Sequence, residues 1–200
     1  MFRLYRIYRR VLAEIFALDS YRLWSRKVLI YFPSVLIGEK HINWGYNCRV
    51  LERSRIEVFD SFNGDTFKPK VTFGNNVSIN YDFHLGCINS VEVGDNVLIA
   101  SRVTIIDHNH GDTTLETLEL SPSIRDLVSK GGIKICRNVW LGENCVVLGG
   151  VEIGENSVIG AGEVVRSNIP ANSIFINDTI IKPEKLHDFS MYLDGKKNKK

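Results

Sequence analysis

Aliphatic and aromatic residues recur at every sixth position along two stretches of the chain. In the first stretch these leading positions are Phe73, Ile79 and Leu85 and, after a two-residue slip, Val93, Ile99 and Ile105. In the second stretch they are Ile135, Leu141, Val147, Ile153, Ile159 and Val165, without interruption. The residue after a leading position is mostly glycine or another small residue, and a second apolar or small residue comes four positions after it.

A period of six matches neither an α-helix nor the simple alternation of a strand. It is typical of a repeat in which the chain makes a short strand, turns a corner and starts again. Three such hexads make one triangular coil, and successive coils stack at the spacing of β-strands, roughly 4.8 Å. The leading residue then fills the interior, and the small residue after it sits at the corner, where a larger side chain would crowd the turn. A β-sandwich would alternate with a period of two and have strands every 8–12 residues, so we predict an all-β fold of the parallel β-helix type.

The predicted organisation has three parts. Residues 1–36 have apolar residues at helical spacing and four arginines on the polar side, which predicts an amphipathic helical segment. We favour packing of this segment on the main domain over binding to an anionic membrane surface, which stays open. Residues 37–182 form the β-helix, with a polar loop at 111–132 that breaks the repeat, and 183–200 form a C-terminal cap and tail. The ends of an open β-helix must be covered, and residues 1–36 and 176–192 are the segments expected to cover them.

Composition and charge agree with an ordinary protein domain. The net charge is +2, with 44% hydrophobic and 24% charged residues, and nothing global indicates nucleic acid binding. The four cysteines are far apart and match neither a zinc site nor a disulfide framework. The start of the chain has no uninterrupted apolar run, so it predicts neither a signal peptide nor a membrane span. We therefore expect a cytoplasmic protein, with contact to the inner face of the membrane as the open alternative.

The segments VEVGDNVLIASRVTIIDHNHG and NVWLGENCVVLGGVEIGENSVIGAGEVVRSNIP resemble the hexapeptide-repeat acyltransferases, in the branch of the sugar O-acetyltransferases. The DHNHG run at 107–111 is similar to the polysaccharide-modifying members. The resemblance implies a left-handed β-helix and a homotrimer with its sites between subunits. It also implies acetyl-CoA as the donor, a hydroxyl of a sugar or glycan as the acceptor, and no metal.

Acetyl transfer from a thioester to a hydroxyl needs a base, and histidine can take a proton at neutral pH. The candidates are His110 and His108. Counted from Ile105, the family's catalytic histidine falls on His110, and His108 is the second choice. A nearby acid can orient such a base, but the sequence does not choose among Asp107, Asp112 and Glu116.

The resemblance also implies residues for the acceptor and the donor. Asn80 falls where galactoside acetyltransferases carry an asparagine that helps to bind the acceptor hydroxyl, and Asp82 borders the same coil. Trp140 should project outward and line the acetyl-CoA channel, where it also touches the acceptor. The remaining expected contacts to acetyl-CoA are Gly142, Glu143, Gly160, Ala161, Arg166 and Lys182.

Three other functions stay open at this point. One is N-acetylation of an amino sugar or nucleotide-linked amino sugar. Another is a β-helix metalloenzyme of the γ-carbonic anhydrase type, for which His84 would have to join His108 and His110. The last is a scaffold that forms trimers without catalysis.

Overall fold

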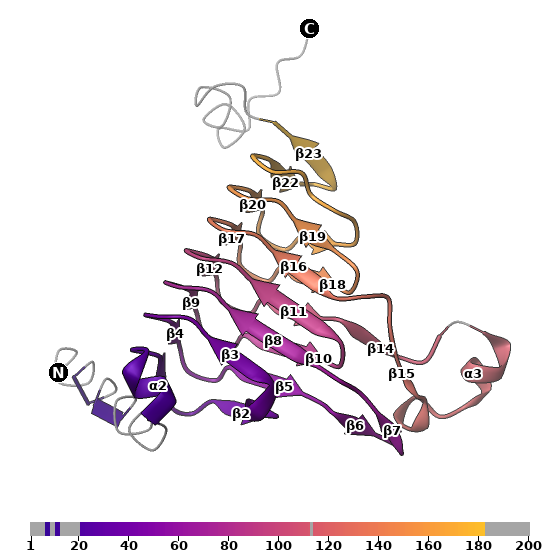
Figure 1. Cartoon of the computed structure of the whole chain (residues 1–200). Helices are drawn as coiled ribbons and strands as arrows, with labels where there is room; N and C mark the ends of the chain where they lie inside the picture. The colour runs from indigo at the N-terminus through magenta and orange to yellow at the C-terminus, as the bar shows by residue number, and fades with distance from the viewer. Residues whose placement is uncertain (1–6, 9–10, 13–20, 113, 183–200) are drawn as a thin grey trace, which may run out of the picture.

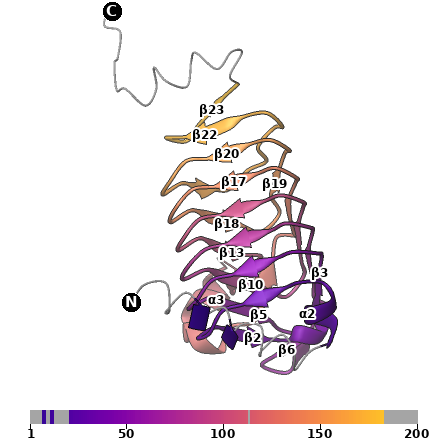
Figure 2. The same ribbon diagram turned by 90° about the vertical axis from the view of Figure 1, so that its left-hand side faces the viewer.

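A triangular prism of stacked coils forms the body of the molecule, and the strands of adjacent coils run parallel (Figure 1). The computed structural model describes residues 7–8, 11–12, 21–112 and 114–182. A coil contributes one short strand to each side of the prism, and Figure 2 shows the coils stacked along a single axis. The fold is the predicted left-handed parallel β-helix.

Three sheets form the sides of the prism. Sheet A contains β1 (Leu29–Ile30), β4 (Arg49–Val50), β9 (Ser78–Ile79), β12 (Leu98–Ile99), β17 (Trp140–Leu141), β20 (Val158–Ile159), β22 (Ile174–Ile176) and the antiparallel β23 (Thr179–Ile181). Sheet B contains β2 (Val35–Ile37), β5 (Arg55–Val58), β10 (His84–Cys87), β13 (Thr104–Ile106), β18 (Val146–Leu148) and β21 (Val164–Val165). Sheet C contains β3 (Ile42–Trp44), β8 (Lys70–Phe73), β11 (Ser90–Val93), β16 (Ile133–Ile135) and β19 (Glu152–Ile153).

The interior of the prism confirms the six-residue period. All twelve leading positions named above are at most 2% exposed, and they stack on one another from coil to coil. The apolar or small residues four positions after a leading residue are buried as well, including Phe83, Cys145 and Ser157. Burial of this continuous apolar column, at roughly 25 cal/mol per Å² of apolar surface, is the main stabilising term of a repeat fold that has no other core.

Small residues are needed at the corners because the next coil passes directly over them. A Cβ at Gly142 would lie 2.7 Å from the backbone nitrogen of Ala161, and a Cβ at Gly94 would lie 2.7 Å from the backbone nitrogen of Arg137. Real Cβ atoms do not come so close to backbone. Where a glycine follows the leading position at a corner, as at 94 and 142, it therefore has the predicted packing role.

A ladder of asparagines runs along the corner between sheets C and A. The six asparagines have a positive φ of 56–59°, and each of the first five donates a side-chain hydrogen bond to the asparagine of the next coil. The rungs are Asn47–Asn76 (2.9 Å), Asn76–Asn96 (3.0 Å), Asn96–Asn138 (3.2 Å), Asn138–Asn156 (3.0 Å) and Asn156–Asn172 (2.9 Å). Asparagine suits this corner because it tolerates the left-handed backbone conformation and also carries a donor and an acceptor.

The two ends of the prism are partly described. Residues 7–8 and 11–12 are helical, and helix α2 (Tyr21–Ser25) buries Leu23 against the first coil. The β22–β23 hairpin lies over the last coil, and the predicted cap and tail at 183–200 lie outside the described residues. The prism begins at Leu29, earlier than the boundary expected at residue 37, because β1 and β2 already form the first coil. No described helix is long and apolar enough to cross a membrane.

Two insertions leave the prism at the corner between sheets B and C, on the right of Figure 1. The first lies between β5 and β8 and contains the antiparallel hairpin of β6 (Ser61–Phe62) and β7 (Asp65–Thr66). The second lies between β13 and β16 and is the predicted loop at 111–132. It leaves through β14 (His108–His110), forms α3 (Leu115–Glu119) and the 3-10 turns η2 (Pro122–Ile124), and returns through β15 (Leu127–Ser129). One 3-10 turn, η1 (Glu39–His41), precedes β3.

Candidate functional site

The two candidate histidines lie on strand β14, where the chain leaves the prism. Residues 108 and 110 are two positions apart on a strand, so their side chains project to the same side. His108 is only 7% exposed, whereas His110 is exposed. Each ring meets a phenylalanine edge to face: the ring centroids are 6.4 Å apart for Phe59 and His108, and 5.6 Å apart for Phe62 and His110.

Of the three acids that the sequence left open, Asp107 is the one that contacts a histidine. Its Oδ1 lies 3.0 Å from Nδ1 of His108, and the carboxylate is buried. A carboxylate only accepts hydrogen bonds, so this contact puts the proton of a neutral His108 on Nδ1 and leaves Nε2 as the acceptor. The same carboxylate accepts the backbone N–H groups of Ile88, at 2.9 Å, and Asn89, at 2.8 Å.

The other two acids do not orient a histidine in the described part of the chain. Asp112 accepts hydrogen bonds from the hydroxyl of Thr114, at 2.7 Å, and from its backbone N–H, at 3.0 Å. These bonds hold the pKa of the Asp112 carboxyl below its usual range. Glu116 lies in the first turn of α3, away from the prism.

A small cavity adjoins His108 on its C-terminal side. The cavity has a volume of about 110 Å³, and Lys130, Leu148, Gly149 and Arg166 line it together with His108 and its neighbours. On the opposite side, a Cβ placed on Gly86 would lie 3.1 Å from Cε1 of His108. The absence of a side chain at residue 86 therefore leaves the space that the buried imidazole occupies.

The candidate donor-side residues gather on sheet A and at the corner between sheets A and B. Trp140 is 45% exposed on the outer face of β17. Gly142 and Glu143 follow it directly at this corner, and Gly160 and Ala161 occupy the equivalent positions one coil further on. These five residues form one continuous strip along the edge of the prism.

Two backbone N–H groups of this strip, those of Glu143 and Ala161, donate no hydrogen bond within the described residues. The N–H of Gly142 donates to the carbonyl of Ile159, at 2.8 Å, so it is used within the fold. The N–H of Glu143 has no hydrogen-bond partner among the described residues. The Glu143 carboxylate accepts a hydrogen bond from Arg102, at 2.9 Å.

Asn80 and Asp82 lie at the A–B corner two coils below. The carboxylate of Asp82 accepts two hydrogen bonds from Arg53, at 2.7 and 2.8 Å, and Arg53 lowers the pKa of the Asp82 carboxyl. The backbone N–H of Asn80 donates to Ile99, and its half-exposed side chain makes no hydrogen bond among the described residues. Asp82 is therefore already paired, whereas the amide of Asn80 is available.

A single chain does not bring all of these residues together. Trp140, Asn80 and the glycines lie on sheet A or at its edge, whereas the histidines lie at the far edge of sheet B. Arg166 lies on the histidine side, at the cavity beside His108 and 3.8 Å from Asp178. Lys182 follows β23 at the C-terminal end and is exposed.

His84 lies one coil below the candidate histidines, within a charged cluster on the outer face of sheet B. Its Nε2 is 3.2 Å from Glu57, and Arg55 contacts both of these residues. Burial, and secondly the charge of Arg55, lower the pKa of His84. No group of three or more histidine, cysteine, aspartate or glutamate side chains placed to hold a metal ion occurs among the described residues.

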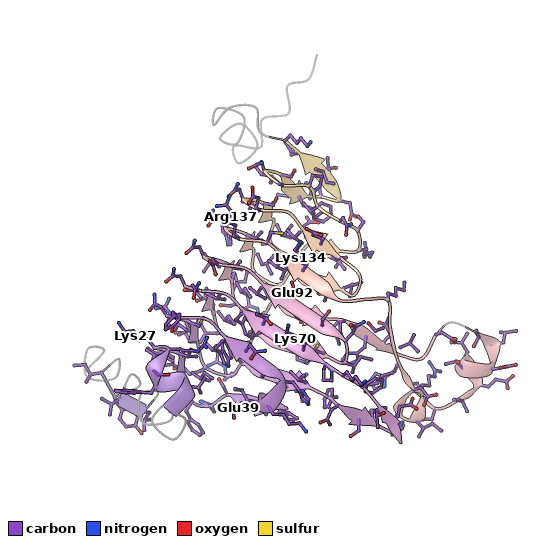
Figure 3. All side chains as sticks on the ribbon, in the orientation of Figure 1. Lys27, Glu39, Lys70, Glu92, Lys134 and Arg137 are labelled. Atoms are coloured by element: carbon purple, nitrogen blue, oxygen red, sulfur yellow. The ribbon has the colours of Figure 1, made fainter. Side chains whose placement is uncertain are left out.

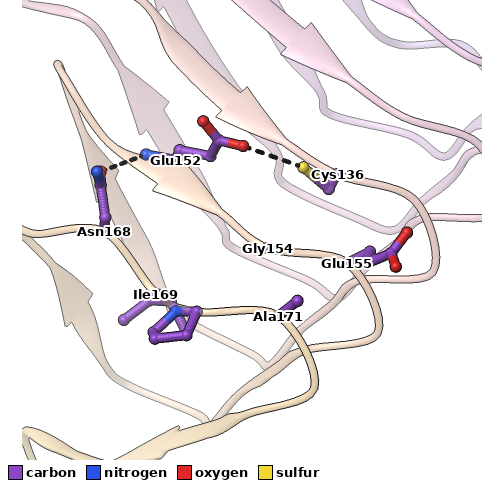
Figure 4. Close-up of a pocket in the computed structure, with 8 residues that line it drawn as sticks. Cys136, Glu152, Gly154, Glu155, Asn168, Ile169 and Ala171 are labelled. Carbon is purple, nitrogen blue, oxygen red and sulfur yellow. Dashed lines mark hydrogen bonds between the residues drawn. The ribbon is translucent and has the colours of Figure 1, made fainter.

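A separate groove of about 490 Å³ lies beside sheet C and the C–A corner (Figure 4). In it, the backbone N–H of Glu152 donates to Asn168, at 2.8 Å, and Sγ of Cys136 lies 3.6 Å from the Glu152 carboxylate. None of the residues that line this groove belongs to the predicted site.

The β6–β7 hairpin was not predicted, although Phe62 within it and Phe59 just before it contact the candidate histidines. The signal for it is present in the sequence. Asn63-Gly64 stands between Ser61-Phe62 and Asp65-Thr66, and an Asn-Gly pair between extended segments is the strongest short-range indication of a two-residue hairpin turn. Both residues of the pair have a positive φ, of 49° and 97°, as that turn requires.

Comparisons with known proteins agree with the geometry. Residues 132–165 match the family model described as bacterial transferase hexapeptide (six repeats). The chain is 36% identical over 150 residues to a protein of Escherichia coli K12 named as a lipopolysaccharide biosynthesis O-acetyl transferase, WbbJ, and the match covers 73% of this chain and 72% of that protein. It is 34% identical over 131 residues to the galactoside O-acetyltransferase of Lactococcus lactis, covering 64% of this chain and 59% of the relative.

A solved structure shares the fold. The complex of AntD, an N-acyltransferase from Bacillus cereus, with dTDP and 3-hydroxybutyryl-CoA superposes with a TM-score of 0.63 at 18% identity. The superposition covers 84% of this chain and 86% of that one.

Proposed function

The chain belongs to the hexapeptide-repeat acyltransferases, in the branch of the sugar O-acetyltransferases, and on this premise we propose that it moves an acetyl group from acetyl-CoA to a hydroxyl of a sugar or glycan. The relatives named for O-acetyl transfer to galactosides and in lipopolysaccharide biosynthesis support this acceptor class. The observation that carries the proposal is the exposed imidazole of His110 at the point where β14 leaves the prism.

The proposed assembly is a homotrimer with its sites between subunits. Charged side chains cover the outer face of sheet C, with Lys70, Glu92 and Lys134 exposed there (Figure 3). The outer face of sheet A exposes Trp140, at 45%, and Leu98, at 41%, and that of sheet B exposes Val35, at 50%, in addition to the charged cluster at His84. Exposed apolar surface of this kind is typical of an interface, so sheets A and B would face neighbouring subunits and sheet C would face water.

This assembly would complete the site. Sheet A of one subunit, with Trp140 and Gly142, would lie against the edge of sheet B of the next, which carries His110. Residues that lie on separate sides of one prism would then face each other across the interface. The half-exposed amide of Asn80, which is on the edge of sheet A, would reach the acceptor hydroxyl in the same way.

His110 acts as the general base in the proposed reaction. It takes the proton of the acceptor hydroxyl while the oxygen attacks the carbonyl carbon of the thioester. The N–H of Glu143, which has no partner in the described structure, would donate to the oxyanion of the tetrahedral intermediate. The C–S bond then breaks, and the thiolate of CoA receives the proton from the imidazolium of His110.

Acetyl-CoA is held in this proposal by the strip along the A–B edge. The glycines at 142 and 160, with Ala161, let the pantetheine arm approach the backbone, and Trp140 covers its apolar side. Arg166 and Lys182 supply the cations for the phosphates, and a guanidinium can bind a phosphate through two parallel hydrogen bonds. Arg166 also lines the cavity beside His108, on the sheet B side of the prism.

An acceptor screen by CoA-thiol release tests the proposal, run over free sugars, nucleotide sugars and lipid-linked or polymeric glycans. The His110→Ala variant should lose roughly 10²-fold or more in turnover, the range for removal of a general base. His41→Ala is the control for loss of an imidazole, because His41 lies in η1 of the first coil and its Nε2 pairs with Asp60, at 3.1 Å. A near-normal rate for His110→Ala would refute His110 as the base.

The same screen, together with a metal assay and an acetyl-CoA binding measurement on the purified protein, separates the alternatives. Turnover only with amino sugars would indicate N-acetylation, and His110→Ala should then cost less because an amine needs the base less. Stoichiometric zinc in the purified protein would instead favour a metalloenzyme. Binding of acetyl-CoA without turnover on any acceptor would indicate a scaffold.

A further inference from the structure

The two insertions meet outside the prism, beyond the B–C corner of the coil that lies between them. The β6–β7 hairpin leaves the second coil and β14 leaves the fourth, both between sheets B and C. The third coil turns this corner tightly, because β10 ends at Cys87 and β11 begins at Ser90. Two ring contacts bridge the gap, Phe59 with His108 and Phe62 with His110.

The contact with Phe62 is the one interaction of the His110 side chain within the described residues. An exposed histidine on a strand that has left the prism is otherwise free to change rotamer. His108 differs in this respect, because Asp107 and the cavity wall hold its ring. The orientation of His110 therefore depends on the hairpin of another coil.

The contact has a defined geometry. The ring centroids are 5.6 Å apart and the ring planes are inclined by 75°, which is the edge-to-face arrangement that aromatic pairs prefer. The hairpin that presents Phe62 is held by Asn63-Gly64 at its tip and by a hydrogen bond from the N–H of Phe67 to the carbonyl of Asp60, at 2.8 Å, at its base. Phe62 is therefore presented by a hairpin that is held at both its tip and its base.

We propose that Phe62 is a positioning residue for His110 and that the β6–β7 hairpin forms a second wall of the acceptor site, opposite the loop at 111–132. This inference rests on the proposed function, because His110 is the proposed base. The hairpin then limits which glycan hydroxyl reaches the imidazole, and Phe62 keeps the imidazole turned toward it. The acetyl-CoA strip along the A–B edge is on another part of the prism and does not include the hairpin.

The first measurement needs neither acceptor nor donor. In NMR spectra of the full chain, the ring of Phe62 should displace the imidazole resonances of His110 from those of a free imidazole. Phe62→Ala and Phe62→Leu should remove this displacement, and Phe62→Tyr should retain it. Phe67→Ala is the matched control: Phe67 is half-buried in the same insertion and contacts neither histidine.

The second measurement uses acetyl-CoA and the acceptor with the highest turnover in the screen. Phe62→Ala should lower kcat/KM for the acceptor about 2- to 10-fold, as expected for loss of one edge-to-face pair, and leave the KM for acetyl-CoA within about 2-fold of the parent value. Phe62→Tyr should restore most of the loss, whereas Phe62→Leu should not. The thermal midpoint of each variant shows whether it is folded.

Two results would overturn the inference. One is unchanged His110 resonances in folded Phe62→Ala. The other is an equal loss of kcat/KM in Phe67→Ala, which would show a general disturbance of the insertion. A screen without any hydroxyl acceptor would end the proposed function, but the NMR measurement would still decide whether Phe62 holds His110.

Discussion

Nδ1 of His108 lies 3.0 Å from Oδ1 of Asp107, and both side chains are buried at the point where the chain leaves the prism. The Asp107 carboxylate also accepts the backbone N–H groups of Ile88 and Asn89, which form the tight corner of the coil beneath. One side chain thus links the start of the loop at 111–132 to the preceding coil. His110 is two residues further along the same strand, so its position depends on this link as well.

Asp107→Asn should destabilise the protein without changing the shape of the side chain. The asparagine amide keeps only one acceptor oxygen. Its NH₂ group would therefore face a backbone N–H, of Ile88 or Asn89, that in the parent protein donates to a carboxylate oxygen. Leaving a buried donor unsatisfied costs about 1–3 kcal/mol, and urea unfolding should show a loss of this size. Asp112→Asn is the control, because Asp112 is exposed and bonds only within its own turn. An equal stability for Asp107→Asn and the parent protein would contradict the role assigned to Asp107.

Asn138→Ala should destabilise more than Asn138→Gly. Alanine loses the two ladder hydrogen bonds, with Asn96 and Asn156, and must also adopt a φ of 58°. The left-handed conformation costs a non-glycine residue about 1–2 kcal/mol, a cost that glycine avoids. Urea unfolding of both variants separates the two effects. Equal losses for alanine and glycine would mean that the hydrogen bonds, and not the backbone conformation, determine the preference for asparagine.

His84 should make the protein less stable in mild acid. Its pKa is lowered in the folded state, by burial first and then by the charge of Arg55, so the unfolded chain binds a proton more readily. The stability from this group is therefore present above the unfolded pKa, about 6.5, and is lost as the pH falls below it. Glu57 opposes the shift, and His108 adds to it.

The thermal midpoint at pH 7.5 and at pH 5.0 measures this dependence. The parent protein should lose more stability between the two values than His84→Gln, which cannot take up the proton. An identical loss in both proteins would assign the pH dependence to other groups.

One of the four cysteines should react readily with a thiol reagent in the folded protein. Cys48, Cys87 and Cys145 are at most 1% exposed, and burial raises the pKa of Cys145 to about 11. Cys136 is partly exposed beside Glu152, although burial also raises its pKa. Titration with a chromogenic disulfide should give one fast thiol, absent in Cys136→Ser, and four in denaturant. Two or more fast thiols in the native protein would show that the prism opens.

The fold was predictable because every hexad must supply an apolar residue to the interior of the prism, and this need recurs every six residues along the chain. Each leading residue, such as Leu141 or Ile153, must fill the same prism, so the sequence repeats its pattern openly. The first coils are less regular: Ile30 and Leu36 are six positions apart, but the next leading residue, Trp44, comes eight positions later, and the β6–β7 insertion interrupts the second coil. For this reason the start of the prism was expected eight residues after Leu29.

The site was predictable only in part. The resemblance named His108, His110 and Trp140, and a motif of this kind needs no three-dimensional information. The partners of these residues come from other coils, as Phe62 and Gly86 do, and no local pattern around position 110 indicates them. The choice of Asp107 over Asp112 likewise depends on the corner at Ile88, which only the folded chain brings within reach.

The asparagine ladder also determines which hexads of successive coils stack on one another. Successive hexads are so alike that the chain could stack with a shift of one hexad, which would rotate a coil by a third of a turn and still bury an apolar residue. The ladder occupies only the corner between sheets C and A, whereas the A–B corner holds other pairs, such as Arg53 with Asp82 and Arg102 with Asn144. A shifted coil would place an asparagine opposite one of these and break the rung on either side of it. The ladder therefore distinguishes otherwise interchangeable hexads, and it fixes the coil from which β14 and His110 leave the prism.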